Sequence, residues 1–134
     1  MLPIFICAFT VKPARQDIIE RSIAVGVGFA ILENAYILTG MVDRVSVIWA
    51  LIRGFGAGMM HGISTLFVGY SMSYVYTKRN LFWTGSIAAL SVAIVYHSIY
   101  NIIVQSEYSL CGILLPIATY IPLTLIILKQ EKSE

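Results

Sequence analysis

Four long apolar stretches constrain this chain more than any other feature of its sequence. They cover about residues 18–39, 45–76, 81–104 and 110–128, and short polar segments separate them. A bilayer core ~30 Å thick is crossed by ~20 residues of α-helix, so each stretch is long enough to span a membrane. The sequence therefore predicts an all-α fold, a polytopic helical membrane bundle of about four transmembrane helices, in a single domain over residues 1–134.

The composition supports a membrane protein. Of the 134 residues, 58% are hydrophobic and 12% are charged, and the mean hydropathy is +0.82. A water-soluble domain of this size has too much surface for its volume to bury so many apolar side chains. The net charge of +2 and the lack of a binding motif argue against nucleic acid as a partner and leave the lipid bilayer. Cys7 and Cys111 lie far apart and are expected to be inert packing residues.

The basic residues predict an orientation. With four spans, most of them fall on one side of the membrane, and Arg44 flanks a span on the other side. The residues on the first side are Lys12, Arg15, Lys78, Arg79, Lys129 and Lys132. Because basic residues concentrate on the cytoplasmic side, both termini are predicted to be cytoplasmic. The apolar segment 1–12 is too short to cross and lacks the features of a signal peptide, so we expect it to be the end of a preceding helix.

Three ionisable residues lie deep in the predicted spans: Glu33 in the first, His61 in the second and His97 in the third. A charge in hydrocarbon costs at least ~2.5–3.5 kcal/mol, so each residue requires a reason. Counting ~1.5 Å per residue from the cytoplasmic edge places all three at a depth of ~24–25 Å. Separate structural roles are the alternative, with hydrogen-bonded histidines and with Glu33 protonated or paired with Arg53. The common depth favours one functional site.

Small residues accompany the deep polar ones. Gly54, Gly58 and Gly62 form a ladder with a spacing of four residues, and His61 and Thr65 lie on the same side of that helix. Such ladders let membrane helices approach closely, so we expect this face to pack against a neighbouring helix.

Two imidazoles and one carboxylate are a typical ligand set for a catalytic zinc ion, with the fourth position left for water. A metal held by Glu33, His61 and His97 would polarise a peptide carbonyl and lower the pKa of water. Without a metal, Glu33 could act as a general base on water, assisted by a histidine. Asn101, one turn after His97, could donate a hydrogen bond to an oxyanion.

Two other chemistries fit the residues less well. Ser64 and His97 could form a nucleophile–base pair, but the sequence around Ser64 is a weak match to a nucleophile turn. The two histidines could hold haem by bis-His ligation, which would make the chain an electron carrier. That hypothesis leaves Glu33 and Asn101 without a role.

Three segments resemble a known family: VGVGFAILENAYIL at residues 25–38, the R-x7-H of Arg53 and His61 followed by Thr65, and YHSIYN at residues 96–101. Together with Asp17 they are similar to the PrsW proteins, polytopic proteases related to CAAX prenyl endopeptidases and bacteriocin-processing enzymes. The resemblance covers about residues 12–104. It implies an active site of Glu33, His61, His97 and Asn101, supported by Asn34 and Arg53.

The resemblance also implies a prokaryotic cytoplasmic membrane and a membrane-protein substrate such as an anti-sigma-factor-like protein. In one respect the chain departs from the family, because the Glu-Glu-x-x-Lys motif expected on a preceding helix is missing. Either the chain begins at an internal methionine of a longer protein or it is a shortened relative. The alternative function is a catalytically inactive membrane scaffold or pseudoprotease.

Overall fold

A computed structural model of the chain describes residues 14–41, 43–108 and 111–131. The described residues form four α-helices and no strand, which confirms the predicted all-α fold. The helices are α2 (Arg15–Thr39), α3 (Val47–Val75), α4 (Arg79–Gln105) and α5 (Cys111–Glu131). Their bounds lie close to those of the four apolar stretches. The predicted segment 1–12 and Cys7 lie outside the described residues.

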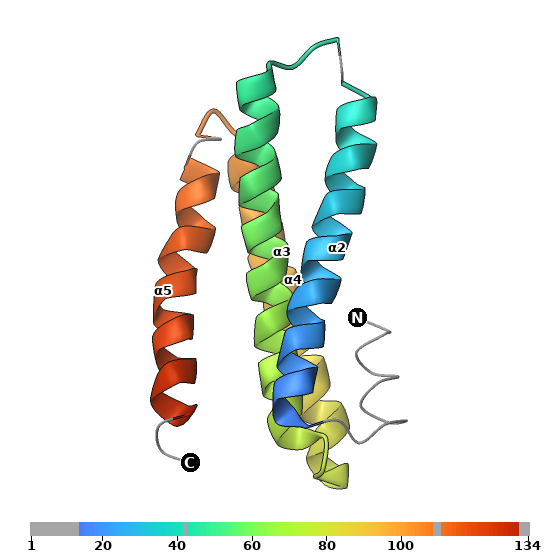
Figure 1. Cartoon of the computed structure of the whole chain (residues 1–134), viewed down its shortest axis with the longest axis vertical. Coiled ribbons are helices and arrows are strands. Elements are labelled where there is room, and N and C mark those ends of the chain that lie inside the picture. The colour runs from blue at the N-terminus through green and yellow to red at the C-terminus, as the bar shows by residue number, and fades with distance from the viewer. Residues whose placement is uncertain (1–13, 42, 109–110, 132–134) are drawn as a thin grey trace.

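The helices run alternately up and down, and α3 occupies the centre of the bundle (Figure 1). In this view α2 lies on one side of α3, α5 lies on the other, and α4 passes behind. Helix α3 contacts each of the other three helices, whereas α2 rests mainly on α3. A residue of α3 can therefore meet partners from several helices, and α3 is the element that positions any shared site.

Side-chain oxygens fix the starts of two helices. The Asp17 carboxylate accepts a hydrogen bond from the Ala14 backbone N–H at 3.2 Å, next to the first turn of α2. At the start of α3, the Ser46 hydroxyl oxygen accepts one from the Trp49 N–H, also at 3.2 Å. Amides at a helix start have no partner within the helix, so these oxygens stabilise the two starts where the sequence places its polar breaks.

Two of the described helices, Arg15–Thr39 and Asn80–Gln105, are long and apolar enough to cross a membrane, and Cys111–Ile126 is a shorter apolar segment. The central helix α3 carries glycines, serines and His61, which lower its hydropathy, and of these His61 and Ser64 are buried against its neighbours. That α3 and α5 also cross the membrane stays a prediction.

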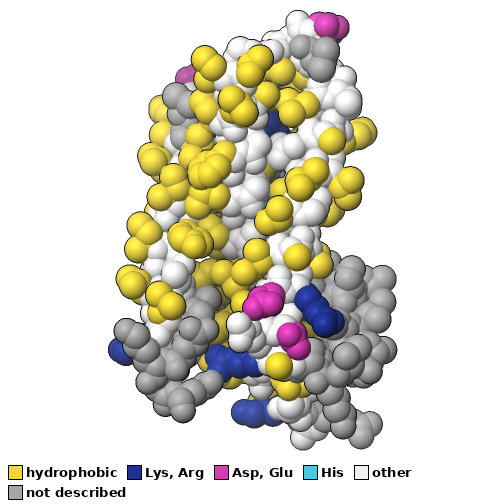
Figure 2. Space-filling model, viewed as in Figure 1, with side chains coloured by type: hydrophobic (Ala, Val, Ile, Leu, Met, Phe, Trp, Pro, Cys, Tyr) yellow, Lys and Arg dark blue, Asp and Glu magenta, His cyan; other side chains and the backbone are white. Residues whose placement is uncertain are grey.

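The surface of the bundle has the character that lipid contact requires. Large apolar side chains such as Leu32, Val47 and Ile102 are about 70% exposed or more. In Figure 2 hydrophobic side chains cover the middle of the visible face, and charged ones gather toward its lower end. An extensive exposed apolar surface of this kind indicates membrane contact.

The closest approach between helices occurs where α2 crosses α3. A Cβ atom added to Gly26 would lie 2.5 Å from the His61 carbonyl oxygen, a distance that no real side chain tolerates. A second close contact lies one turn nearer the start of α2, at Ser22. There a Cβ added to Gly69 of α3 would overlap the Ser22 side chain. Glycine is therefore required at both positions for α2 and α3 to lie this close.

The prediction that the Gly54, Gly58 and Gly62 ladder packs against a neighbouring helix is wrong. A Cβ added to any of these glycines would meet no atom within 4 Å. They line a groove of about 770 Å³ that α2 and Tyr120 of α5 complete. The sequence periodicity identifies the stripe of small residues, but α2 packs against the adjacent face of α3 and leaves the stripe open.

Candidate metal centre

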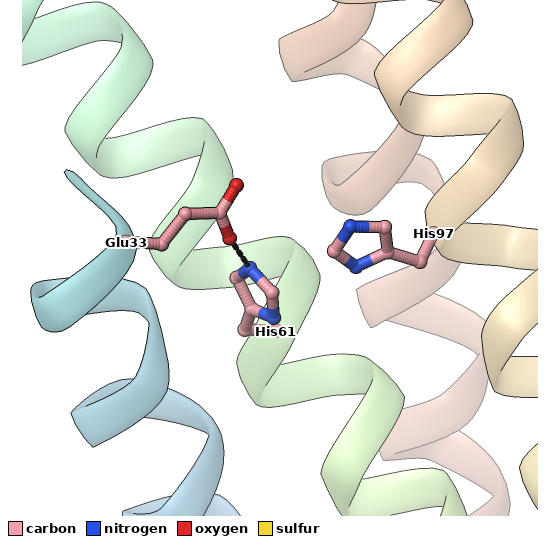
Figure 3. A group of neighbouring side chains, drawn as sticks. All are labelled: Glu33, His61 and His97. Carbon is pink, nitrogen blue, oxygen red and sulfur yellow. Dashed lines mark hydrogen bonds and ion pairs between the residues drawn. The ribbon is translucent and has the colours of Figure 1, made fainter. Parts of the chain in front are cut away.

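Three side chains from three helices meet in the interior of the bundle. Glu33 comes from α2, His61 from α3 and His97 from α4, and Figure 3 shows the side chains of all three turned toward one another. One ligand atom of each residue, a carboxylate oxygen or an imidazole nitrogen, lies within 4.8 Å of the other two. The proximity that the depth count predicted is thus confirmed.

Glu33 and His61 are joined directly. Nε2 of His61 lies 2.6 Å from Oε2 of Glu33, and the side chains are 7% and 23% exposed, respectively. A carboxylate that is largely withdrawn from solvent is stabilised when it is paired and hydrogen-bonded. This hydrogen bond therefore explains how α2 carries a carboxylate in an apolar stretch.

His61 is held from several directions. The Phe29 ring packs on it with the ring centroids 5.0 Å apart, and the His97 ring meets it edge to face at 4.8 Å. The Thr65 hydroxyl donates to the His61 carbonyl oxygen at 2.8 Å. Because its backbone and its ring are both restrained, His61 is the fixed member about which the other two are arranged.

The local sequence of α2 brings Glu33 within reach. Gly26 and Ala30 precede it on the same face, and both are buried against α3. Their small size lets α2 lie close to α3 just below Glu33. The carboxylate can therefore reach the His61 imidazole without a bend in either helix.

The other residues predicted for the site are not part of this cluster. Asn34 donates from Nδ2 to the Ala30 carbonyl oxygen at 2.9 Å, and it lines the groove of the glycine ladder. Its Oδ1 is buried and has no partner among the described residues. Asn101 is half-buried one turn beyond His97, and in the described part of the chain it forms no hydrogen bond with the cluster.

Arg53 is half-buried and lies near Trp49, with its guanidinium carbon 5.6 Å from the ring centroid. Its Nε atom is buried and has no hydrogen-bond partner in the part of the chain that the structure describes. Glu33 is paired with His61. The structure therefore does not favour the other explanation for Glu33, an ion pair with Arg53 that serves only the fold.

The geometry disfavours the two other chemistries. Ser64 directs its hydroxyl to the Met60 sulfur at 3.7 Å rather than to an imidazole. The imidazoles of His61 and His97 touch each other, whereas bis-His ligation places a porphyrin between the two rings. No room for haem exists between them.

The residues present fit a divalent metal ion. Two imidazole nitrogens and one carboxylate oxygen are the donor set of many catalytic zinc sites. Ligand atoms that share a tetrahedral zinc at ~2.0–2.2 Å lie ~3.3 Å apart, so a separation of up to 4.8 Å closes with modest side-chain rotation. Metal binding would break the Glu33–His61 hydrogen bond, because both atoms would then bind the ion.

Phe29 is a part of the site that enters the sequence prediction only as one letter of a motif. Its ring forms one wall of the site and packs on His61. A signal was available, because Phe29 precedes Glu33 by four residues and so lies on the same helix face.

A helical bundle with an apolar surface that gathers a carboxylate and two imidazoles inside it has the fold and the ligand set of a membrane metalloenzyme. Residues 19–128 match the family described as PrsW family intramembrane metalloprotease, and the chain belongs to that family. This match extends to residue 128 and so includes most of α5, whereas the motifs in the sequence resemble the family only over about residues 12–104. Comparisons with curated proteins and with solved structures give no match. As a member of this family, the chain is an integral membrane protein.

Proposed function

We propose that the chain hydrolyses a peptide bond of a membrane-protein substrate at a metal site made by Glu33, His61 and His97. The observation that carries the proposal is the convergence of these three ligand-type side chains, from three helices, to within 4.8 Å in a member of the PrsW family. Deep polar residues of membrane helices mark functional sites by default, because their burial is unfavourable.

Each residue has a defined part in this proposal. His61 and His97 would hold the ion through imidazole nitrogens and Glu33 through a carboxylate oxygen. The chemistry that zinc supplies in such a site is polarisation of the scissile carbonyl and acidification of a bound water. Phe29 packs on the His61 ring and restricts its orientation.

A mechanism without a metal is the alternative for the same site. The 2.6 Å hydrogen bond to His61 supports it, because it joins the carboxylate to a second proton carrier. Glu33 would take a proton from the attacking water, and His61 would share that proton. The two mechanisms differ in whether cleavage depends on a metal.

The test uses the full chain purified in detergent. Bound zinc is measured by elemental analysis, and cleavage of a set of transmembrane peptides is measured by mass spectrometry. We expect bound zinc and cleavage in the unmodified protein, and loss of both in His61→Ala and His97→Ala. Cleavage should disappear with a chelator and return with zinc. Full cleavage by the metal-free protein would support the glutamate mechanism, and cleavage by the double histidine variant would overturn the proposed site.

We further propose a prokaryotic cytoplasmic membrane, cytoplasmic termini and a substrate such as an anti-sigma-factor-like membrane protein. The arrangement of the helices supports the orientation. Arg15 begins α2, Lys78 lies in the turn between α3 and α4, and Lys129 lies in the last turn of α5. Because the helices alternate in direction, all three basic residues belong to one end of the bundle (Figure 1).

The second candidate function is a catalytically inactive scaffold. A protein that retains zinc at Glu33, His61 and His97 but cuts no peptide, and still binds membrane partners, would indicate this function.

A further inference from the structure

A cavity of about 340 Å³ opens beside the two histidines, between α2, α3 and α4. Both His61 and His97 line it, so an occupant lies directly against the proposed metal ligands. Its volume is at the lower end of the ~300–1,000 Å³ that is usual for ligand pockets. The cavity is thus suited to one substituent rather than to a whole helix.

The walls of this cavity are apolar. Phe29 of α2 forms one side, and Leu90, Ala93 and Ile94 of α4 form another. Apart from the two histidines, no ionisable residue lines it within the described part of the chain. A charged substituent would be desolvated there without a partner, which is strongly unfavourable.

The three hydroxyl groups in the lining already have partners for their protons. Ser64 donates to the Met60 sulfur, Thr65 to the His61 carbonyl oxygen, and Ser98 to the Ile94 carbonyl oxygen at 2.9 Å. An occupant therefore meets no free hydroxyl donor from these residues. The lining favours hydrocarbon over polar groups.

Ala93 determines how much space is available. It lies one turn before His97 on α4, is 6% exposed, and contributes only a methyl group to the wall. A larger side chain at this position would occupy the cavity next to His97.

We propose that this cavity is a specificity subsite that receives the side chain of the substrate residue next to the cleaved peptide bond and selects large apolar side chains. The proposal rests on the proposed peptidase function. A substrate residue such as leucine or phenylalanine fills the cavity and places its own peptide bond beside the histidines. Alanine leaves the cavity partly empty, and aspartate or lysine is rejected.

The test is a series of transmembrane peptides that differ only at the residues flanking the cut, with products identified by mass spectrometry. For the unmodified protein we expect kcat/KM to be at least ~10-fold higher for leucine or phenylalanine than for alanine at one flanking position, since a single methylene in a pocket changes it ~10–200-fold. Ala93→Leu should lower kcat/KM for the phenylalanine peptide at least ~10-fold more than for the alanine peptide.

Ala88→Leu is the matched control, because Ala88 lies on the exposed side of the same helix. Leu90→Ala provides a second variant that enlarges the cavity, and it should increase the relative rate for the largest side chains. Bound zinc, measured in each variant, reports whether the site is still assembled.

The outcomes separate the two proposals. If the unmodified protein cuts peptides without preference at either flanking position, or if Ala93→Leu has the same profile as Ala88→Leu, the subsite is refuted and the peptidase function stands. If the unmodified protein holds no zinc and cuts no peptide, both proposals fail.

Discussion

Glu33 is hydrogen-bonded to His61, a residue that would bind the same metal ion as Glu33 does. Its carboxylate is hydrogen-bonded to Nε2 of His61 at 2.6 Å, in an interior where an unpaired carboxylate would be unfavourable. A bound metal would replace this hydrogen bond with two metal–ligand bonds. The same pair therefore stabilises the metal-free protein and supplies two of its three ligand-type atoms.

We expect Glu33→Gln to abolish cleavage and to weaken zinc binding by more than the ~10–100-fold that is usual for losing a residue that only supports a ligand. The amide has the same shape but no charge, so the fold should persist. Zinc affinity is measured by competition with a chelating dye, and folding by circular dichroism.

Glu20→Gln is the control for this change. Glu20 lies on the exposed side of the same helix and is hydrogen-bonded to Gln16. The control should leave zinc affinity and cleavage unaltered. Normal zinc affinity in Glu33→Gln would exclude the carboxylate as a ligand.

The sequence could predict depth but not rotation. Counting residues along each span is enough to bring Glu33, His61 and His97 to one level, because helical rise is nearly constant. Asn34 and Asn101 are predicted for the site only from their positions beside Glu33 and one turn after His97 and from the family motif. Asn34 follows Glu33 by one residue, so it is rotated by ~100° about the helix axis. It therefore lines the groove beside Gly54, Gly58 and Gly62 and not the metal site. Which face of a helix its neighbours cover depends on how the whole bundle packs, and the sequence alone does not determine that.

At the level of helices, the contact between α2 and α3 fixes the site. Gly26 meets the Thr65 hydroxyl and the backbone of His61, and Gly69 meets Ser22. The His61 backbone cannot move aside as a side chain can, so it limits how far α2 and α3 can adjust at Gly26. Glu33 lies two turns beyond Gly26. Any increase in the distance between the helices at Gly26 is therefore transmitted to the Glu33–His61 hydrogen bond.

Gly26→Ala should destabilise the folded protein by about 1–3 kcal/mol, as overpacking usually does, because the new methyl group would collide with the His61 carbonyl oxygen. Thermal unfolding in detergent measures this loss, and zinc affinity should fall with it.

Gly28→Ala is the control for Gly26→Ala, since an added Cβ meets no atom within 4 Å there. The control should be neutral or stabilising by up to ~1 kcal/mol through helix propensity. Equal effects of the two substitutions would contradict the close contact at Gly26.

Gly58→Ala tests the open ladder. A ladder that packs against another helix within the chain would lose stability on this change, as the sequence pattern alone suggests. The structure leaves the position open, so we expect no loss of stability and a gain of up to ~1 kcal/mol. Unfolding of purified monomer in detergent is the appropriate measurement, and a loss comparable to that of Gly26→Ala would refute the open groove.

Considered as a whole, the molecule is organised around α3. The other helices contact it from different sides, and a hydrogen bond of 2.6 Å between Tyr96 and Thr119 links α4 to α5. Alternation of direction places the α2–α3 connection at the end of the bundle opposite to the α3–α4 turn (Figure 1).

The proposed orientation gives a labelling pattern that can be measured on intact cells. In a background with both native cysteines replaced by serine, Asp43→Cys in the α2–α3 connection should react with a membrane-impermeant maleimide. Gln16→Cys at the start of α2 should react only after the membrane is permeabilised. The reverse pattern would refute cytoplasmic termini.

The three ligand-type residues also follow one another along the chain, on successive helices. Helices of a membrane protein enter the bilayer in order during synthesis, so the hairpin of α2 and α3 exists before α4 arrives. At that stage Glu33 and His61 can already form their hydrogen bond, so the carboxylate has a partner before α4 and α5 are in place. The third ligand comes only with α4. A nascent chain therefore has all three ligand-type residues only once α4 has entered, before α5 follows, and no shorter fragment carries the complete set.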